Sequence, residues 1–459
     1  MELITKIVAA VNDVLWNKQL LLLFLLLGTG IFYSIRTRFV QVRKFGQGCR
    51  QLFGSISLSG DKAGKDGMSS FQALATAIAA QVGTGNISGC ATALYSGGPG
   101  AIFWMWLSAF FGMSTIYGEA ILAQTYRTTD ENGHVTGGPI YYIRAAFRGG
   151  FGKFLAGFFS VAIILALGFM GNMVQSNSIA DAFQTAFSLP PLLIGVIISA
   201  LAAFVFFGGM GRIAAFTEKV VPIMAALYLL GGLIVLLANA SHIIPALKMV
   251  FVGAFDPAAA TGGIIGAGVK EAMRYGVARG LFSNEAGMGS TPHAHAMAKV
   301  KHPEEQGVIA MMGVFIDTFV VLTLTALVIL SSGLLQPLAE GGLTATKLAQ
   351  AAFSQAFGSF GNPFVAICML FFAFSTIIGW YFFGKTNVNA LFHGSKAANI
   401  VYALIALAFI VVGSVQKVSL VWDMSDMFNG LMVIPNLLAL LVLSGQVAKI
   451  ARADHLAKK

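Results

Sequence analysis

The stretch AAQVGTGNISG, from Ala79 to Gly89, lies in the middle of an apolar segment that runs from Ser69 to about Tyr95. A segment of this length can cross a bilayer, which takes about 20 apolar residues. Each glycine costs an ordinary helix about 1 kcal/mol relative to alanine, and the amide of Asn86 finds no water inside a membrane. The stretch therefore indicates either close packing against a neighbouring helix or a membrane helix that is interrupted near its centre.

The composition is that of an integral membrane protein. The chain has 459 residues, of which 57% are hydrophobic and 10% are charged, and its mean hydropathy is +0.78. Soluble domains carry about 25% charged residues. The net charge of +10 fits basic cytoplasmic loops, so we expect no nucleic-acid partner. The three cysteines suggest neither a disulfide framework nor a metal site, and we expect no cleaved signal peptide at the start.

Long apolar runs predict eleven membrane-spanning helices. The first spans Leu15–Ile35 and is followed by a basic amphipathic connection. The other ten are expected at about 69–95, 101–126, 153–185, 191–208, 214–238, 264–293, 307–332, 362–390, 397–413 and 423–445.

The distribution of basic residues predicts the orientation. Most of the 29 Lys and Arg residues fall in alternate connections, beginning with the one that follows Arg36. Cytoplasmic loops carry such an excess. We therefore expect the N-terminus outside and the C-terminus in the cytoplasm. The cytoplasmic set includes Lys62, Lys65, Lys385, Lys396, Lys458 and Lys459.

A second interrupted segment lies half a molecule away from the first. GLFSNEAGMGSTP, from Gly280 to Pro292, is Gly-rich and polar at a comparable depth. If the first helix is an accessory, ten helices divide into two groups of five with opposite orientations, which is an inverted repeat. The predicted parts are an accessory segment (1–66), a first repeat (67–240), an inverted second repeat (262–446) and a cytoplasmic tail (447–459).

Paired interruptions of this kind point to the binding site of a transporter. An unwound turn exposes N–H groups that suit an anionic group and carbonyls that suit a cation. The expected ligand is therefore small and carries both charges, as an amino acid does. The competing interpretation is that the glycines form faces for close helix packing.

These residues resemble the alanine or glycine:cation symporter family, also called sodium:alanine symporters. The resemblance rests on FQALATAIAAQVGTGNISG, GGPGAIFWMW, GLFSNEAGMGSTP and FIDTFVV, and it extends along essentially the whole chain. It implies an all-α leucine-transporter-type fold with one extra N-terminal helix. It also implies Na⁺-driven uptake of alanine or glycine, with D-alanine and serine as further candidates.

The family motif also suggests roles for residues in both interruptions. Amides of the first would receive the substrate carboxylate, and groups of the second would surround the amine and side chain. Gln175 is expected to hydrogen-bond the substrate, and the Trp380 indole to limit side-chain size unless it is only a packing or interfacial aromatic. The full expected substrate set is Gly83, Thr84, Gly85, Asn86, Gln175, Phe282, Ser283, Asn284 and Trp380.

A sodium site is expected beside the first interruption. Ser375 and Thr376 offer adjacent hydroxyls, which in this fold type complete a site with the carbonyls of Ala79 and Val82. Neutral oxygens suffice for a hard monovalent cation. The alternative is that both hydroxyls bond only to their own helix.

Three carboxylates lie well inside predicted spans, where such groups are functional by default. Glu285 either faces the substrate ammonium or ties the broken turn to a neighbour. Glu119 is expected to brace the broken helices, and Asp317 to brace them or join a relay. His293 and His295 do not share a helix face, so a metal site is disfavoured.

The leading function is sodium-coupled import of small neutral amino acids by alternating access, performed by a monomer in the cell membrane. A proton-coupled amino-acid transporter is the alternative. An intramembrane enzyme is disfavoured because the polar residues form no nucleophile–base pair, and a channel because no filter repeat is present. A metal-ion transporter is disfavoured because GTGN lacks an aspartate.

Overall fold

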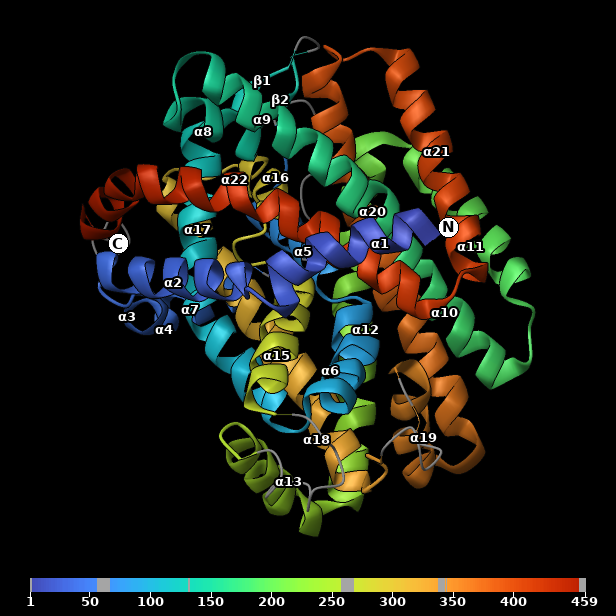
Figure 1. Ribbon diagram of the computed structural model, residues 1–459. Helices are drawn as coiled ribbons and strands as arrows, with labels where there is room; N and C mark the ends of the chain where they lie inside the picture. Colours follow the sequence, from blue (N-terminus) through green and yellow to red (C-terminus); the bar gives the residue numbers. More distant parts are fainter. Residues whose placement is uncertain are drawn as a thin grey trace.

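The protein is a bundle of helices with one short β-hairpin (Figure 1). The computed structural model describes residues 2–55, 67–130, 133–256, 268–336, 343 and 345–453. Of the basic residues used to predict the orientation, Lys62, Lys65, Lys458 and Lys459 lie outside these ranges. The predicted tail 447–459 is described as far as residue 453.

The N-terminal segment is longer than the sequence predicted. Helix α1 (Glu2–Asn12) continues into the π-helix η1 (Asp13–Asn17), and α2 (Leu21–Arg36) follows after a left-handed residue, Leu20, with φ 53°. The expected helix thus begins at Glu2 and is broken in its middle. The reason is that ELITKIVAAVN is itself amphipathic enough to pack along the molecule. Two short helices complete this segment, α3 (Val40–Arg43) and α4 (Phe45–Ser55).

The first half of the core begins with a broken helix. Its two halves are α5 (Ser70–Gln81) and α6 (Cys90–Gly97), joined by the π-helix η2 (Gly85–Gly89). The other elements are α7 (Gly100–Thr125), β1 (Thr128–Thr129), β2 (Val135–Thr136), α8 (Pro139–Ala146), α9 (Gly149–Ile163), the π-helix η3 (Ile164–Gly171), α10 (Asn172–Phe187), α11 (Pro191–Phe206), α12 (Gly209–Ala238) and α13 (Ala240–Gly253). No helix was expected at α13.

The second half also begins with a broken helix, formed by α15 (Val269–Asn284) and α16 (Pro292–Ala296). The remaining elements are α17 (Pro303–Val314), the π-helix η4 (Phe315–Leu322), α18 (Thr323–Ser332), α19 (Ala345–Phe357), the 3₁₀-helix η6 (Gly358–Phe360), α20 (Gly361–Leu391), α21 (Lys396–Val415) and α22 (Val418–Ala453).

Contacts between the halves place the two broken helices side by side. Helix α7 packs against both α15 and α17, and α5 packs against α12 and α20. Met68, just before α5, donates its N–H to Met297 O at 2.8 Å, and Lys299 N–H returns a bond to Met68 O at 2.9 Å. The start of one broken helix is therefore joined to the end of the other.

Eight helical segments among the described residues are long and apolar enough to cross a membrane. Helices α11 and α13 are apolar but shorter, with 16 and 14 residues. The chain is thus an all-helical, multi-pass membrane protein. The count of eleven spans, the division into five and five, and the orientation stay predictions.

Candidate functional site

The first interruption is narrower than the sequence indicated. Helix α5 ends at Gln81, Val82 leaves helical geometry with ψ 88°, and a π-helix begins at Gly85. Gly85 and Asn86 are therefore helical. A side chain at Gly83 would collide with the Thr376 hydroxyl and meet Gln175 Oε1 at 3.0 Å, so the break needs glycine for close approach.

Side-chain oxygens satisfy two of the amides assigned to the substrate carboxylate. Gly83 N–H donates to Asn86 Oδ1 at 3.0 Å, and Thr84 N–H donates to Gln175 Oε1 at 3.1 Å. The Thr84 hydroxyl and Gln175 Nε2 are buried without a hydrogen-bond partner within the described part of the chain. Buried polar atoms are nearly always paired, so these two indicate a polar ligand or water at this point.

The four residues of the expected sodium site lie together. Thr376 Oγ1 is 2.9 Å from Ala79 O and 3.5 Å from Val82 O, and Ser375 Oγ is 3.2 Å from Ala79 O. Both hydroxyls also lie 2.9–3.0 Å from Phe372 O. The bonds to their own helix therefore coexist with contacts across to α5. This arrangement of neutral oxygens suits a hard monovalent cation.

The second interruption is held open by two glutamates. Helix α15 ends at Asn284, and Glu285 (φ 59°), Gly287 (φ 88°) and Gly289 (φ 81°) all take left-handed conformations. The Glu119 carboxylate accepts the N–H groups of Gly287 at 3.0 Å and Gly289 at 2.9 Å. Glu119 thus provides acceptors for two backbone N–H groups of the turn. Buried backbone groups outside a regular helix require such partners.

Glu285 lies inside the same turn, and its side chain contacts that turn and helix α20. Its carboxylate accepts the Ser290 hydroxyl at 2.5 Å and the Trp380 indole N–H. Glu285 and Trp380 are both fully buried. Both carboxylate oxygens are therefore engaged by protein groups, and the role of Glu285 stays a prediction.

The two interruptions touch each other. A Cβ on Gly85 would lie 3.0 Å from Ser283 Cα, and Gln81 Nε2 donates to Asn284 O at 2.7 Å. Asp317, on η4, accepts Asn86 Nδ2 at 2.7 Å and the Ser283 hydroxyl at 3.0 Å. One buried carboxylate therefore connects both broken helices.

Aromatic rings form one wall of this region. The Trp380 ring lies 5.5 Å from the Phe282 ring at 89°, and a side chain at Gly171 of η3 would overlap it. The Asn284 side chain is bonded elsewhere, since its Nδ2 donates to Thr318 Oγ1 and its Oδ1 accepts Ala286 N–H, both at 3.1 Å. Trp380 and Phe282 therefore pack against each other at the second interruption, and the limit on ligand size expected from Trp380 stays a prediction.

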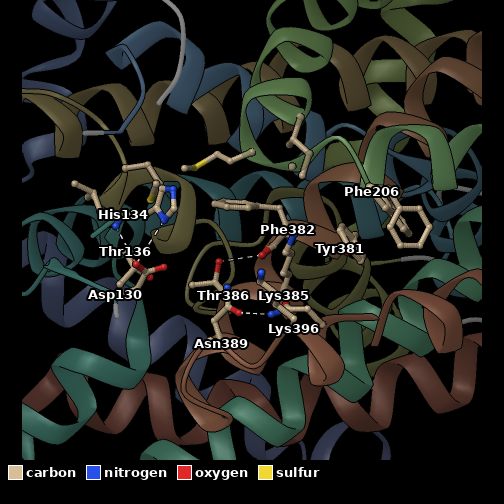
Figure 2. A pocket seen from close by; sticks show the side chains of 18 of the residues that line it. Asp130, His134, Thr136, Phe206, Tyr381, Phe382, Lys385, Thr386, Asn389 and Lys396 are labelled. Carbon is tan, nitrogen blue, oxygen red and sulfur yellow. Dashed lines mark hydrogen bonds and ion pairs between the residues drawn. The ribbon is translucent and has the colours of Figure 1, made fainter. Parts of the chain in front are cut away.

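A cavity of about 490 Å³ lies beyond Trp380 toward the C-terminal end of α20. Figure 2 shows Tyr381, Phe382, Lys385 and Thr386 on one side and the hairpin residue His134 on the other. Lys385 follows Thr376 by nine residues, or roughly 14 Å along a helix. Met297, directly after α16, also lines the cavity. The cavity therefore adjoins the C-terminal ends of α16 and α20.

The histidines are buried packing residues rather than an exposed pair. His293 Nδ1 lies 2.7 Å from Ser290 O, and its Nε2 lies 2.8 Å from Asn387 Nδ2. His295 Nδ1 lies 2.7 Å from Gln306 Nε2. Within the ranges described, no group of three or more His, Cys, Asp or Glu residues could hold a metal ion.

Asn436 belongs to the site although it was not predicted from the sequence. Its Nδ2 donates to Glu119 at 2.6 Å and to Gly287 O at 2.9 Å, and its Oδ1 accepts the Tyr142 hydroxyl at 2.5 Å. Asn436 is an amide inside the last apolar segment, so the criterion that selected Asn86 also applies to it.

Comparison with solved structures shows the fold. The chain aligns with MhsT in complex with L-phenylalanine at a TM-score of 0.53 and 14% identity, covering 87% of this chain and all of MhsT. It aligns with the Eremococcus coleocola manganese transporter at a TM-score of 0.51 and 17% identity, covering 82% and 76%. Both are transporters of the leucine-transporter-type fold, and the present chain shares that fold.

Sequence comparison then gives the family. The chain matches the Sodium:alanine symporter family over residues 1–459 and belongs to it. It is 42% identical to the sodium/alanine symporter AgcS of Methanococcus maripaludis, over 99% of this chain and 98% of AgcS. It is also 42% identical to the probable sodium/glutamine symporter GlnT of Bacillus subtilis, over 100% and 92%. The putative sodium/proton-dependent alanine carrier protein YrbD of Bacillus subtilis is 40% identical, over 98% and 92%.

Proposed function

We propose that this protein imports alanine, glycine or a similarly small neutral amino acid together with Na⁺ by alternating access. The observation that carries the proposal is the meeting of Gly85 and Ser283, with the unpartnered Thr84 hydroxyl and Gln175 Nε2 beside it. The substrate carboxylate would take the place of the side-chain oxygens now bonded to Gly83 and Thr84 N–H. Na⁺ would sit among the oxygens of Ala79, Val82, Ser375 and Thr376.

The ion and the substrate would cooperate through α5. Na⁺ between α5 and α20 fixes the end of α5, and the substrate bridges that end to Ser283. Each therefore orders groups that the other needs, which is positive coupling in the binding free energies. The expected 67–240 and 262–446 repeats would then move relative to each other, and the 490 Å³ cavity would serve as the inner exit.

Substrate size follows from the aromatic wall. Trp380 and Phe282 lie edge to face at 5.5 Å, and two bulky rings beside the interruptions favour a substrate with a small side chain. We therefore expect glycine, alanine and serine to compete for uptake and glutamine to compete poorly. Glutamine is the informative competitor, because the relative GlnT is named as a probable sodium/glutamine symporter.

Proton coupling is the second candidate function, and Asp317 favours it. Its carboxylate is fully buried and contacts both Asn86 and Ser283, so gaining or losing a proton would change how the two broken helices are joined.

Uptake of labelled alanine into proteoliposomes tests both functions. A sodium gradient at equal pH should drive accumulation, and a pH gradient without sodium should not. Accumulation driven by the pH gradient alone would contradict sodium coupling and support the proton alternative. Protein-free liposomes are the control.

A further inference from the structure

A buried ion pair lies on the aromatic wall, on the side away from the cavity. Arg279 is on α15, one turn before Phe282, and pairs with Asp426 of α22. Each is 3% exposed. The guanidinium lies 4.4 Å from the centre of the Trp422 ring, and that ring is 4.6 Å from Phe282. Arg279 precedes the second interruption and Met297 of the cavity follows it, so the pair and the cavity lie at opposite ends of the site.

This ion pair is incompletely satisfied. Arg279 Nε and Nη1 are buried and have no hydrogen-bond partner among the described residues. Removing two charges from water is costly, and the cost is recovered only where all their polar atoms are bonded. The paired state of Arg279 and Asp426 is therefore only weakly favoured over a separated state. A small change at Asp426 should shift the equilibrium between the two.

The N-terminal segment reaches the turn of α22 that carries Asp426. Trp16 Nε1 donates to Asp426 O at 3.1 Å, and Asn12 Nδ2 donates to Asp423 O at 2.8 Å. Trp16 is 2% exposed, and α1 packs along α22 (Figure 1). Both bonds go to backbone carbonyls, so they hold the turn itself in place while the Asp426 side chain stays directed at Arg279.

We propose that the N-terminal segment positions Asp426, through Trp16 and Asn12, so that the Arg279–Asp426 pair closes the end of the site away from the cavity. Trp16 and Asn12 are positioning residues in this device. The inference rests on the proposed transport function, because a closure that alternates with the opposite cavity has meaning only in a transporter. In this proposal the accessory N-terminal segment contributes to closing the site during the transport cycle.

Thiol accessibility tests the proposal. Ser425 lies one turn after Trp422 on the same face of α22, directly precedes Asp426 in the chain, and is fully buried. In the Ser425→Cys protein, a membrane-impermeant maleimide should react slowly at residue 425, measured by peptide mass spectrometry. Adding Trp16→Phe, which keeps an aromatic ring and removes the N–H donor, should speed the reaction about five- to tenfold. Asn12→Ala should act in the same direction.

Trp104→Phe is the matched control. It removes an indole donor whose 3.2 Å bond also goes to a backbone carbonyl, that of Ala254, and it should leave the labelling rate unchanged. Asp426→Asn should itself accelerate labelling, and Trp16→Phe should then add nothing, because Trp16 acts through Asp426. Purely structural damage by Trp16→Phe would instead add to the effect of Asp426→Asn.

The outcomes separate the two proposals. An unchanged labelling rate in both Trp16→Phe and Asn12→Ala, in protein that transports alanine, overturns the positioning role and leaves the transport function standing. Additive effects of Trp16→Phe and Asp426→Asn overturn it as well. Faster labelling in both variants, with no alanine uptake by the unsubstituted protein under any gradient, overturns the transport function alone.

Discussion

Asp317 holds together residues that are far apart in the sequence. Its carboxylate receives Asn86 Nδ2 at 2.7 Å and Ser283 Oγ at 3.0 Å, while Thr318 Oγ1 donates to it at 2.9 Å. A charge at this depth is costly unless donors surround it. Two of these donors, on Asn86 and Ser283, come from the two broken helices, so the carboxylate stabilises one particular packing of the two interruptions.

Thr376 provides the residue-scale test of the sodium site. Thr376→Ala removes the only one of the two hydroxyls that reaches both Ala79 O and Val82 O. We expect the sodium concentration for half-maximal alanine uptake to rise about tenfold, since one lost oxygen contact is worth about 1.4 kcal/mol. Sodium titrations of uptake in proteoliposomes measure this.

Thr125→Ala is the matched control for Thr376. Within the described part of the chain, its hydroxyl bonds only to its own helix, at Ile121 O, 2.7 Å away. It should leave the sodium dependence unchanged. An unaltered sodium dependence in Thr376→Ala itself would remove Thr376 from the ion site.

At the scale of elements, π-helices surround the candidate site. Helix η2 contains Asn86, η4 contains Asp317, and η3 packs Gly171 against Trp380. The π-helical turn is rare and is often found at functional sites, because its wider spacing redirects side chains and frees backbone groups. The helices here are therefore irregular where they meet the site.

The turn between α15 and α16 gives an element-scale prediction. Glu119→Ala leaves the N–H groups of Gly287 and Gly289 buried without an acceptor, which costs about 1–3 kcal/mol for each group. We expect a clear fall in the thermal unfolding midpoint in detergent. Glu119→Gln keeps one acceptor oxygen and should lose about half as much.

Glu271→Ala is the control for Glu119. Glu271 Oε2 accepts Gly268 N–H at 3.1 Å at the exposed start of α15, where water can replace it. Its removal should cost about 1 kcal/mol or less. Equal midpoints for Glu119→Ala and Glu271→Ala would show that Glu119 does not support the turn.

The whole molecule is asymmetric about the candidate site. At one end the Arg279–Asp426 pair is buried, and at the other a cavity of about 490 Å³ adjoins Lys385. The lining of this cavity includes residues from connections that the positive-inside rule assigns to the cytoplasm, among them Lys396. The described conformation is therefore closed on the predicted outer side.

The predicted orientation can be measured directly. Ser241→Cys, at the exposed start of α13, is expected outside, and Gly150→Cys, at the exposed start of α9, is expected in the cytoplasm. An impermeant thiol reagent added to intact cells should label residue 241 and spare residue 150 until the cells are permeabilised. The reverse pattern would invert the topology.

The membrane class, the helical architecture and the two interrupted helices could all be predicted from local signals, namely apolar length, and glycine with polar residues at mid-span. The family was predicted from the resemblance of four motifs. The sequence also located Ala79, Val82, Ser375 and Thr376, which the structure brings together. That grouping came from the family resemblance, since nothing local links residues 79 and 376.

Which buried polar groups meet became clear only from the packing of the helices. The narrow break at Val82–Gly83, the π-helices, helix α13 and the start of the first helix at Glu2 all depart from the sequence-based expectation. The partners of Asp317, the contact of Asn436 with Glu119, and the bond from Trp16 to the turn of Asp426 were likewise not foreseen. The physical reason is that hydrophobic periodicity is a local property, whereas pairing of buried polar groups depends on which helices pack together.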